Sequence, residues 1–478
     1  MNSHTEIQRD WSASIWDRIL PVWTFLFVVA VYAPLAGQRS AWSDDLPLLV
    51  DKSKIVEQSV DDARPVLALV NWLVLGSTDT IGQLVLPRLL GVLGIALFVG
   101  YMTRVFRNSG WSSWTSALLA CSVGLLPPFY GYAGWATAFS YPWLVLMGAW
   151  SGSTWVDSLR DRRLARAALA FIVFLTAILA YPPAAMFCWA VLGIRLASTH
   201  VSLRRSVIDS LSMGGLVLVA GTAGLAIGRI LMAVLDVEPS RLQIVDSVPE
   251  VVDKLVWFVT HPIAVAARPF QISSPGNTAA VLTAGPVLVV IAVGLYLRQN
   301  GLRTERAASV SLLMGLCALT MTMHLVSVDN QIEYRFMSGI VVLTWVYLVV
   351  AIRAIHRWLS GRTAGIERLG VVGVAALAVV VGVATSQART TIEQVFIRPA
   401  EVKEQYLTDR LEGFDPAQHD RIVVLEPAEA WPSRTNLGIY SSRTDLGHGW
   451  VIEPNLCLLL EERHRDGICP VVEVVDQP

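Results

Sequence analysis

Two pairs of adjacent acids stand in the short stretch that follows the first apolar segment of the chain. Asp44 and Asp45 come first, and Asp61 and Asp62 follow shortly before Arg64. Carboxylates close to membrane-length segments are costly unless they face water or a bound cation, so they indicate a site by default. The alternative is a solvated loop whose acids have no role. We favour the site because the acids recur in pairs within one short loop.

One of these carboxylates could serve as a general base. A carboxylate within hydrogen-bond reach of an acceptor hydroxyl can take its proton as a new bond forms. Burial near the membrane interface would raise its pKa toward neutrality. Only one of two adjacent side chains usually points into a site, and we prefer Asp44 over Asp45. Asp61 and Asp62 would hold the acceptor or orient Arg64.

A second polar stretch, 328–336, precedes a late apolar segment and contains Glu333-Tyr334-Arg335. A guanidinium is a bidentate partner for phosphate, so Arg335 beside Tyr334 at the membrane interface would suit a lipid-linked phosphate. The alternative is an arginine that reaches to the interface and pairs with Glu333. Other basic residues on the same predicted face favour a shared anion pocket: Arg64, Arg88, Arg241, Lys254 and Arg268. Tyr181 lies in another turn on that face, whereas we expect His261 and His324 to be structural or solvated.

The bulk composition indicates that a membrane positions these residues. Of the 478 residues, 54% are hydrophobic and 16% are charged, and the mean hydropathy is +0.53. Continuous apolar runs reach about 20 residues, the length that a bilayer core requires, and they do not alternate as barrel strands do. We therefore predict an all-α polytopic membrane protein. The sequence has no basic tract typical of nucleic-acid binding and no metal-site spacing, so we expect no nucleic-acid partner, metal or cofactor.

We predict about eleven transmembrane helices, at roughly 19–36, 82–103, 112–127, 133–156, 164–181, 183–199, 207–235, 278–298, 308–328, 337–356 and 369–387. The segment from Pro65 to Leu75 is too short to cross and predicts a helix at the membrane interface, with Pro65 in its first turn. The two segments around Tyr181-Pro182-Pro183 predict either a tight hairpin or a broken helix. Arg229, inside the seventh segment, has no explanation in the sequence.

Basic residues alternate between successive connections, which sets the orientation. The arginine-rich connections belong in the cytoplasm together with the N-terminus; they contain Arg104 and Arg107, Arg160 to Arg166, Arg195 to Arg205, Arg298 to Arg306, and Arg353 to Arg368. The other connections face the exoplasm, and they are 37–81, 127–133, 181–183, 236–277 and 328–336. An odd number of crossings places the C-terminal tail there too.

The composition turns polar near Thr390. We therefore divide the chain into a transmembrane domain, 1–388, which includes the exoplasmic loop 37–81, and a small exoplasmic α/β domain, 389–478. Within the tail, 393–411 has helical character, and Arg421 to Glu426 is typical of a buried strand. Cys457 and Cys469 could pair as a disulfide if the tail lies outside the cytoplasm. The other three cysteines lie in apolar runs and are expected to behave as small hydrophobes.

Together these features resemble the GT-C class of integral-membrane glycosyltransferases, and within it the bacterial serotype-converting O-antigen glucosyltransferases. The resemblance covers essentially the whole chain in topology and order. The motifs that carry it are Ser43-Asp44-Asp45, Asp62-Ala63-Arg64-Pro65 before the short interfacial helix, Leu86-Pro87-Arg88 leading into the next span, Glu333-Tyr334-Arg335, and the small exoplasmic tail.

The resemblance implies an enzyme of the bacterial inner (plasma) membrane that takes a sugar from a polyprenyl-phosphate donor. The acceptor would be a hydroxyl of a cell-envelope glycan or glycolipid, and transfer would invert the anomeric centre without an essential metal. An acid of the first exoplasmic loop, Asp44 or Asp45, would be the base. The donor phosphate would be held by an arginine near the interface, Arg335 or Arg64, and we add Arg88 and Tyr334 as candidates.

The rival class is a transporter or flippase of a lipid-linked or polar solute. Such proteins usually carry polar residues or broken helices near mid-membrane, often in two related halves. The predicted spans here are almost free of ionisable residues, and the two halves are not alike. A non-enzymatic scaffold that presents the tail is the third possibility.

Overall fold

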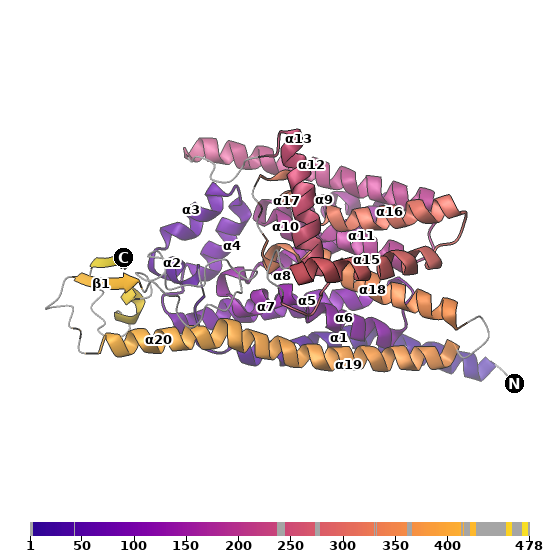
Figure 1. Cartoon of the computed structure of the whole chain (residues 1–478), viewed down its shortest axis with the longest axis horizontal. Coiled ribbons are helices and arrows are strands. Elements are labelled where there is room, and N and C mark those ends of the chain that lie inside the picture. The colour runs from indigo at the N-terminus through magenta and orange to yellow at the C-terminus, as the bar shows by residue number, and fades with distance from the viewer. Residues whose placement is uncertain are drawn as a thin grey trace.

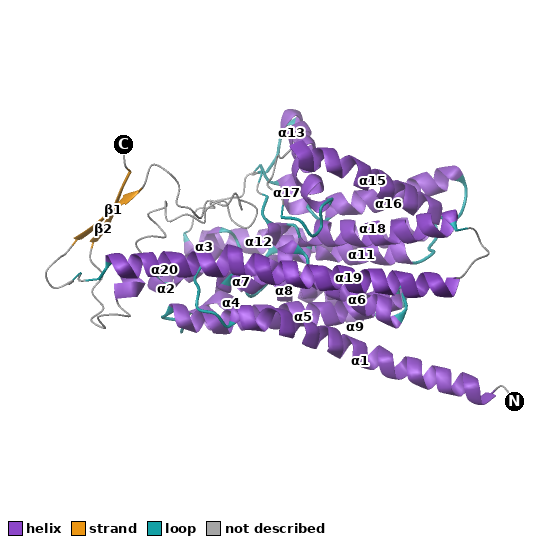
Figure 2. Ribbon diagram, turned by 60° about the horizontal axis from the view of Figure 1, so that its bottom comes forward, coloured by secondary structure: helices purple, strands orange, loops and turns teal. Residues whose placement is uncertain are grey.

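The computed structural model of this chain describes residues 3–42, 44–236, 244–272, 278–328, 330, 332–360, 366–412, 414, 421–426, 456–460 and 471–476. Most of them are helical, and the long helices run side by side along the long axis of the molecule (Figure 1). The N-terminal end of the chain lies at one end of this bundle, and the C-terminal strands lie beyond the other (Figure 2).

The long elements make up the body of the bundle. They are α1 (Ser3–Ala36), α5 (Val85–Asn108), α6 (Ser113–Gly124), α8 (Tyr141–Arg160), α9 (Leu164–Ala180), α11 (Phe187–Ser198), α12 (Leu203–Leu235), α15 (Thr278–Arg298), α16 (Arg303–Leu319), α18 (Ser338–Leu359) and α19 (Ile366–Ile392). The last of these continues through a π-helical turn, η5 (Glu393–Ile397), into α20 (Arg398–Arg410).

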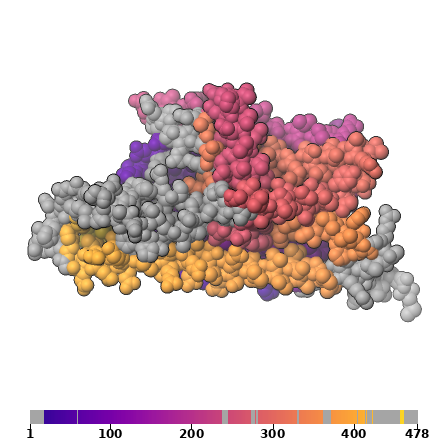
Figure 3. All heavy atoms as spheres, in the orientation of Figure 1, coloured from indigo at the N-terminus to yellow at the C-terminus, as the bar shows by residue number. Residues whose placement is uncertain are grey.

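Shorter elements gather at the end where α1 finishes. They are α2 (Asp45–Val50), α3 (Ser53–Asp61), α4 (Pro65–Leu75), η1 (Ile81–Leu84), α7 (Pro127–Gly134), η2 (Ala136–Ala138), α10 (Pro182–Ala185), α13 (Val248–Phe258), η3 (Val259–Ile263), α14 (Ala264–Ala266), α17 (Thr322–Val326) and η4 (Tyr334–Phe336). In the space-filling view, the segment that begins with α13, in crimson, crosses the bundle as a ridge (Figure 3). The predicted short helix from Pro65 to Leu75 is confirmed with these bounds.

The described helices make this an all-α, multi-pass membrane protein. Six of them are long and apolar enough to cross a bilayer: Arg18–Ala36, Ile81–Asn108, Leu203–Leu235, Val281–Arg298, Ser338–Leu359 and Val371–Arg410. A seventh is added if α6 and α7, which meet at an angle of 61°, form one broken span. Each of the eleven predicted segments contains a helix, and the number that cross the membrane stays a prediction.

The outer faces of these helices are apolar, as a lipid environment requires. On α12, Leu211 and Leu218 are each 70% exposed and Val234 is 74% exposed. Water-soluble monomers rarely expose apolar surface on this scale. Arg229 lies on the same helix, exposed, and within two turns of its end at Leu235. From there a long basic side chain can reach the membrane surface.

The segments around Tyr181 fold back as a hairpin against α8. At one end of α8, the ring of Tyr141 stacks on that of Tyr181, with centroids 4.1 Å apart. At its other end, Asp157 pairs with Arg195 near the end of α11. Because α9 precedes Tyr181 and α11 ends beyond Arg195, the chain must reverse direction between them. Of the two predicted alternatives, the hairpin is confirmed.

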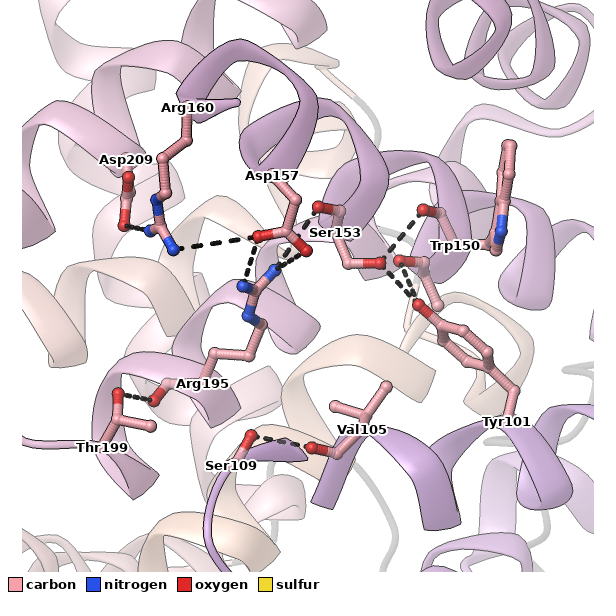
Figure 4. Close-up of polar contacts among 11 residues, drawn as sticks. Tyr101, Val105, Ser109, Trp150, Ser153, Asp157, Arg160, Arg195, Thr199 and Asp209 are labelled. Carbon is pink, nitrogen blue, oxygen red and sulfur yellow. Dashed lines mark hydrogen bonds and ion pairs between the residues drawn. The ribbon is translucent and has the colours of Figure 1, made fainter. Parts of the chain in front are cut away.

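The arginine-rich end of the bundle is tied together by ion pairs (Figure 4). Arg195 binds both carboxylate oxygens of Asp157, at 2.6 and 3.2 Å. Arg160 donates to Asp209 on α12 at 3.0 Å. These bonds join α8, α11 and α12, and the bidentate geometry of the Arg195–Asp157 pair is the stronger form of arginine–carboxylate pairing.

The tail contains two parallel strands, β1 (Arg421–Glu426) and β2 (Val471–Asp476). The predicted helix at 393–411 and strand at Arg421–Glu426 are thus both confirmed. A small apolar cluster joins the end of α20 to the segment 456–460; its members include Leu407, Leu411 and Leu460. Cys457 is disulfide-bonded, whereas Cys121, Cys188 and Cys317 are free and buried. Cys469, the predicted partner of Cys457, lies outside the described residues.

Candidate functional site

Asp45 is committed to the backbone of a neighbouring loop. Its carboxylate accepts hydrogen bonds from the N–H groups of Trp42 and Thr137, each at 2.9 Å, and from Ala136 at 3.4 Å. The residue is only 1% exposed. Burial raises the pKa of Asp45 to about 6, although these bonds and the charge of Arg88 oppose the rise. Asp45 therefore fixes the loop that follows α1 onto η2, which begins directly after Trp135.

Asp44 occupies a different environment from its neighbour. It precedes α2 as the N-cap residue, but its side chain does not cap that helix. The residue is partly exposed. Its charge acts on Tyr141 and on Arg335. Of the two predicted bases, Asp44 is the one whose carboxylate faces a cation and a tyrosine from distant parts of the chain.

Arg335 lies at the centre of this group. Its guanidinium is 4.9 Å from the ring centroid of Trp135 and the same distance from that of Phe336. Its Nε atom pairs with the carboxylate of Glu333. Burial would lower the pKa of Arg335, but the charges of Glu333 and Asp44 raise it above the ordinary value. The side chain is 20% exposed. The charged guanidinium thus contacts two aromatic rings and pairs with Glu333 through Nε.

Arg64 comes from the loop between α3 and α4. Its Nη1 atom lies 3.0 Å from a carboxylate oxygen of Asp62, and its guanidinium lies 5.0 Å from the ring centroid of Tyr181. The loop turns through Ala63, whose φ of 57° is left-handed. A Cβ atom at Gly228 of α12 would lie 2.8 Å from that of Ala63. The close approach of α12 therefore sets where Arg64 can lie.

Stacked aromatic rings connect the two arginines. The ring of Tyr181 stacks on that of Tyr141 at 4.1 Å and lies near that of Phe336 at 6.1 Å. Tyr132 packs edge-on against Tyr141 and donates a hydrogen bond to the carbonyl oxygen of Arg335 at 2.8 Å. The predicted residues Arg64, Tyr181 and Arg335 are thus brought together, with Glu333 and Asp62 as their acidic partners.

Two further basic residues face the same group. His324 packs against the ring of Phe336, with centroids 4.6 Å apart. Burial, followed by three positive charges, lowers the pKa of His324 to about 3; the charges belong to Lys254, Arg64 and Arg335. Lys254 is 5% exposed and lies 4.9 Å from the ring centroid of Trp257. His324 is therefore neutral at physiological pH, beside three cations that come from three separate parts of the chain.

Apart from the Glu333–Arg335 ion pair, three buried polar atoms of this group have no hydrogen-bond partner among the described residues. They are Oη of Tyr181, Nε2 of His324 and Nε1 of Trp135. Buried polar atoms are nearly always paired, and an unpaired one calls for an explanation. Three such atoms beside converging cations fit a surface that binds a polar, anionic ligand. We define the candidate site as the two arginines with the charged, aromatic and histidine side chains grouped around them. Its residues are Asp44, Asp62, Arg64, Trp135, Tyr141, Tyr181, Lys254, His324, Glu333, Arg335 and Phe336.

The remaining predicted residues lie outside it. Arg88 is 1% exposed and donates hydrogen bonds to Ser40 and to the carbonyl oxygen of Leu84. Its positive charge interacts with the negative charge of Asp45, which is not a member of the site. Tyr334 is equally buried and donates to the carbonyl oxygen of Gln271 at 3.1 Å. Asp61 ends α3 and is partly exposed. Arg241 lies outside the described residues, and Arg268 donates to Thr283 at 2.7 Å.

Sequence reasoning missed four members of the site, which are Trp135, Tyr141, His324 and Phe336. His324 had been assigned to a span, but α16 ends at Leu319 and α17 begins at Thr322, so this residue lies beyond the break. Trp135 and Tyr141 were hidden within apolar, aromatic-rich sequence. The pair Thr320-Met321 between two apolar stretches was a weak signal for the break.

Comparison with known proteins gives no match: no family model matches the chain, and no curated protein matches it. Among the described residues, no three or more His, Cys, Asp and Glu side chains are grouped so that they could hold a metal ion. The interpretation of the site therefore depends on its geometry.

Proposed function

We propose that this protein is an inverting glycosyltransferase of the GT-C type, which moves a sugar from a polyprenyl-phosphate donor to a hydroxyl of a cell-envelope glycan or glycolipid. The observation that carries the proposal is that Asp44 lies near enough to Arg335 for its charge to act on the guanidinium. These residues are nearly three hundred positions apart in the sequence, and the reaction needs both a base and a cation at one site.

The cations suit a donor phosphate. A guanidinium carries five N–H donors in a fixed fork, and Glu333 engages only Nε of Arg335. The terminal nitrogens of Arg335 make no hydrogen bond to the described residues, and Arg64 and Lys254 add charge nearby. As the bond between the sugar and the phosphate breaks, the electron pair goes to the phosphate oxygen. Fixed cations at that position stabilise the developing charge.

Asp44 suits the acceptor. In this scheme its carboxylate takes the proton of the acceptor hydroxyl, whose oxygen forms the new bond to the anomeric carbon. Polyprenyl phosphate leaves from the opposite face, so the configuration inverts. Tyr141 and Tyr181 would line the space between base and phosphate, where the sugar must sit. The base and the leaving group are held by different loops, which fixes their alignment before reaction.

The proposal includes the finer topology. Eleven crossings would place the arginine-rich ends in the cytoplasm with the N-terminus, and the candidate site in the outer leaflet of a bacterial inner membrane. The four segments beyond the seven best candidates are α8, α9, α11 and α16, which have 20, 17, 12 and 17 residues. The tail would then be a small α/β domain on the exoplasmic side of the membrane. The disulfide of Cys457 can form in that compartment.

The decisive experiment compares Asp44→Asn with Asp51→Asn in cells that otherwise lack the protein. Asp51 is in the same loop, but its carboxylate bonds Ser53. We expect Asp44→Asn to reduce transfer by roughly 100-fold or more, the range of general-base catalysis, at normal expression. Asp51→Asn should retain transfer. Envelope glycan analysis measures both, and an unchanged glycan in Asp44→Asn would remove the residue from the base role.

The transporter alternative is separated by a reaction without compartments. Purified protein in detergent is mixed with polyprenyl-phosphate sugar and an envelope glycan fraction from cells lacking the protein. A transferase forms product under these conditions, whereas a transporter has no membrane to move its solute across. Absence of product, together with a glycan defect in the cells, would favour transport.

A further inference from the structure

A pocket lies at the opposite end of the bundle from the candidate site. It is a cavity of about 330 Å³ between α1, α5 and the start of α6. Its lining consists of Arg18, Leu20, Pro21, Thr103, Arg104, Arg107, Asn108 and Ser113. Arg18 is one helical span away from Ala36, where α1 reaches the other end. The pocket is therefore separate from the site proposed for transfer.

The pocket has the chemistry of an anion site. Three of its lining residues are arginines, and none of the described lining residues is acidic. Arg107 is oriented by a hydrogen bond from Nη1 to the carbonyl oxygen of Trp111 at 2.9 Å. Ser113 is the first residue of α6, a helix of 12 residues. The first turn of a helix presents N–H groups and a positive dipole end, which favour a bound phosphate.

The position of the pocket favours a lipid as the source of that phosphate. Arg18 begins one candidate span, and Asn108 ends another. Apolar side chains, Leu20 and Pro21, line the side that continues into the span. Basic pockets between membrane helices on the cytoplasmic side bind anionic headgroups.

We propose that this pocket binds the phosphate of an anionic phospholipid headgroup. The guanidinium groups of Arg18 and Arg104 would contact the phosphate oxygens, with Asn108 beside the glycerol part of the headgroup. Both arginines line the pocket and are exposed, so a lipid headgroup can reach them without unfolding of the helices. The proposal does not depend on the transferase reaction.

The test uses full-length protein in detergent and native mass spectrometry. Wild type is titrated with phosphatidylglycerol and with phosphatidylcholine, and the double variant Arg18→Gln/Arg104→Gln is treated in the same way. We expect selective retention of phosphatidylglycerol by wild type and a loss of roughly tenfold or more in the variant, since each basic residue near an anionic lipid is worth a few-fold in affinity. Arg107 is left in place because it bonds to the backbone.

The matched control is Arg204→Gln/Arg205→Gln. These arginines are exposed at the start of α12, and they lie at the same end of the bundle but outside the pocket. The control should bind within about twofold of wild type. Equal loss in both double variants, or no loss in Arg18→Gln/Arg104→Gln, would overturn the proposal. Glycerol phosphate is the soluble probe: binding as tight as that of the lipid would assign the pocket to a soluble phosphate and overturn the lipid assignment.

Discussion

Arginine and carboxylate side chains meet at both ends of α8, but in two different arrangements. At the arginine-rich end, Arg195 lies edge-on to both oxygens of Asp157. At the other end, Arg335 lies between two aromatic faces and pairs through Nε alone. Tyr141 and Asp157 are sixteen positions apart, which separates the two ends by about 24 Å along the helix axis.

The difference separates a structural contact from a binding contact. A guanidinium that is bidentate to a carboxylate has used its best donors, and it ties helices together. A guanidinium that stacks on aromatic rings is positioned by its faces, so its edges stay available to a ligand. This distinction predicts which arginine substitutions affect function and which affect only stability.

The largest expected effect is that of substituting Arg335, which is one of two arginines that each stack on a tryptophan. Arg335 lies 4.9 Å from the ring of Trp135 at the candidate site, and Arg353 lies 4.8 Å from that of Trp111 at the other end. We expect Arg335→Ala to reduce donor use by about 100- to 1,000-fold, as for the loss of one charge-stabilising donor. Arg335→Lys should recover part of this because it keeps the charge without the fork.

The control for that comparison is Arg353→Lys, which should leave donor use unchanged. Initial rates against donor concentration measure all three variants. Comparable losses in Arg353→Lys and Arg335→Lys would mean that stacked arginines at both ends act through the fold, and the distinction between the ends would be lost.

The next effect concerns the buried acid beside the site. The pKa of Asp45 is about 6 in the folded protein against 3.8 ordinarily, so the folded state holds this proton more tightly. Stability is therefore greatest below the ordinary pKa and falls as the pH rises toward the folded value. The fall amounts to at most about 3 kcal/mol between roughly pH 4 and 6.

Thermal unfolding in detergent across this pH range measures the effect. Asp45→Asn has no proton to lose at this position, so its unfolding temperature should vary less with pH than that of wild type. It should also reduce activity, because the loop that carries Trp135 depends on this carboxylate. An identical pH profile in the variant would assign the dependence to other groups.

Breaking the ion pair at the arginine-rich end should have a smaller effect, confined to stability. Arg195→Gln removes the bidentate contact with Asp157. The side chains of Arg195 and Asp157 are 26% and 39% exposed, respectively. We expect a loss of about 1–2 kcal/mol, at the lower end for charged hydrogen bonds because water screens the pair. The unfolding temperature should drop, while the rate of sugar transfer, measured well below that temperature, stays within twofold of that of wild type. A large loss of rate at full folding would connect this end to the chemistry.

The sequence was sufficient for the class and for most of the elements. Long apolar runs specify membrane helices whatever their neighbours, and Pro65 fixed the start of α4. Sequence reasoning preferred Asp44 over Asp45 but could not show what each carboxylate contacts, because Asp45 is held by N–H groups of Thr137 and Ala136, which are some ninety residues away. Arg88 was assigned to the donor for the same reason: nothing local shows that it lies beside Asp45.

His324 illustrates a second limit. Its apolar surroundings in sequence suggested a span, yet burial in the fold, and after it three cations from other elements, lower its pKa. Charges that converge only after folding leave no local pattern. Residues at the edge of apolar runs are therefore the ones for which sequence and structure differ most here.

The smallest expected effect tests whether α12 positions the site without touching a ligand. A methyl group at Gly228 would lie 2.8 Å from Cβ of Ala63, whereas one at Gly221, two turns earlier, would meet no atom within 4 Å. Gly221→Ala should stabilise the helix by up to about 1 kcal/mol. Gly228→Ala gains the same propensity but must displace Ala63, which holds a left-handed turn directly before Arg64. We therefore expect a few-fold rise in KM for the donor with little change in kcat, because the displaced arginine binds the phosphate before and during transfer alike. If both alanine variants have the KM of wild type, the loop adjusts without moving Arg64, and α12 has no part in positioning this arginine.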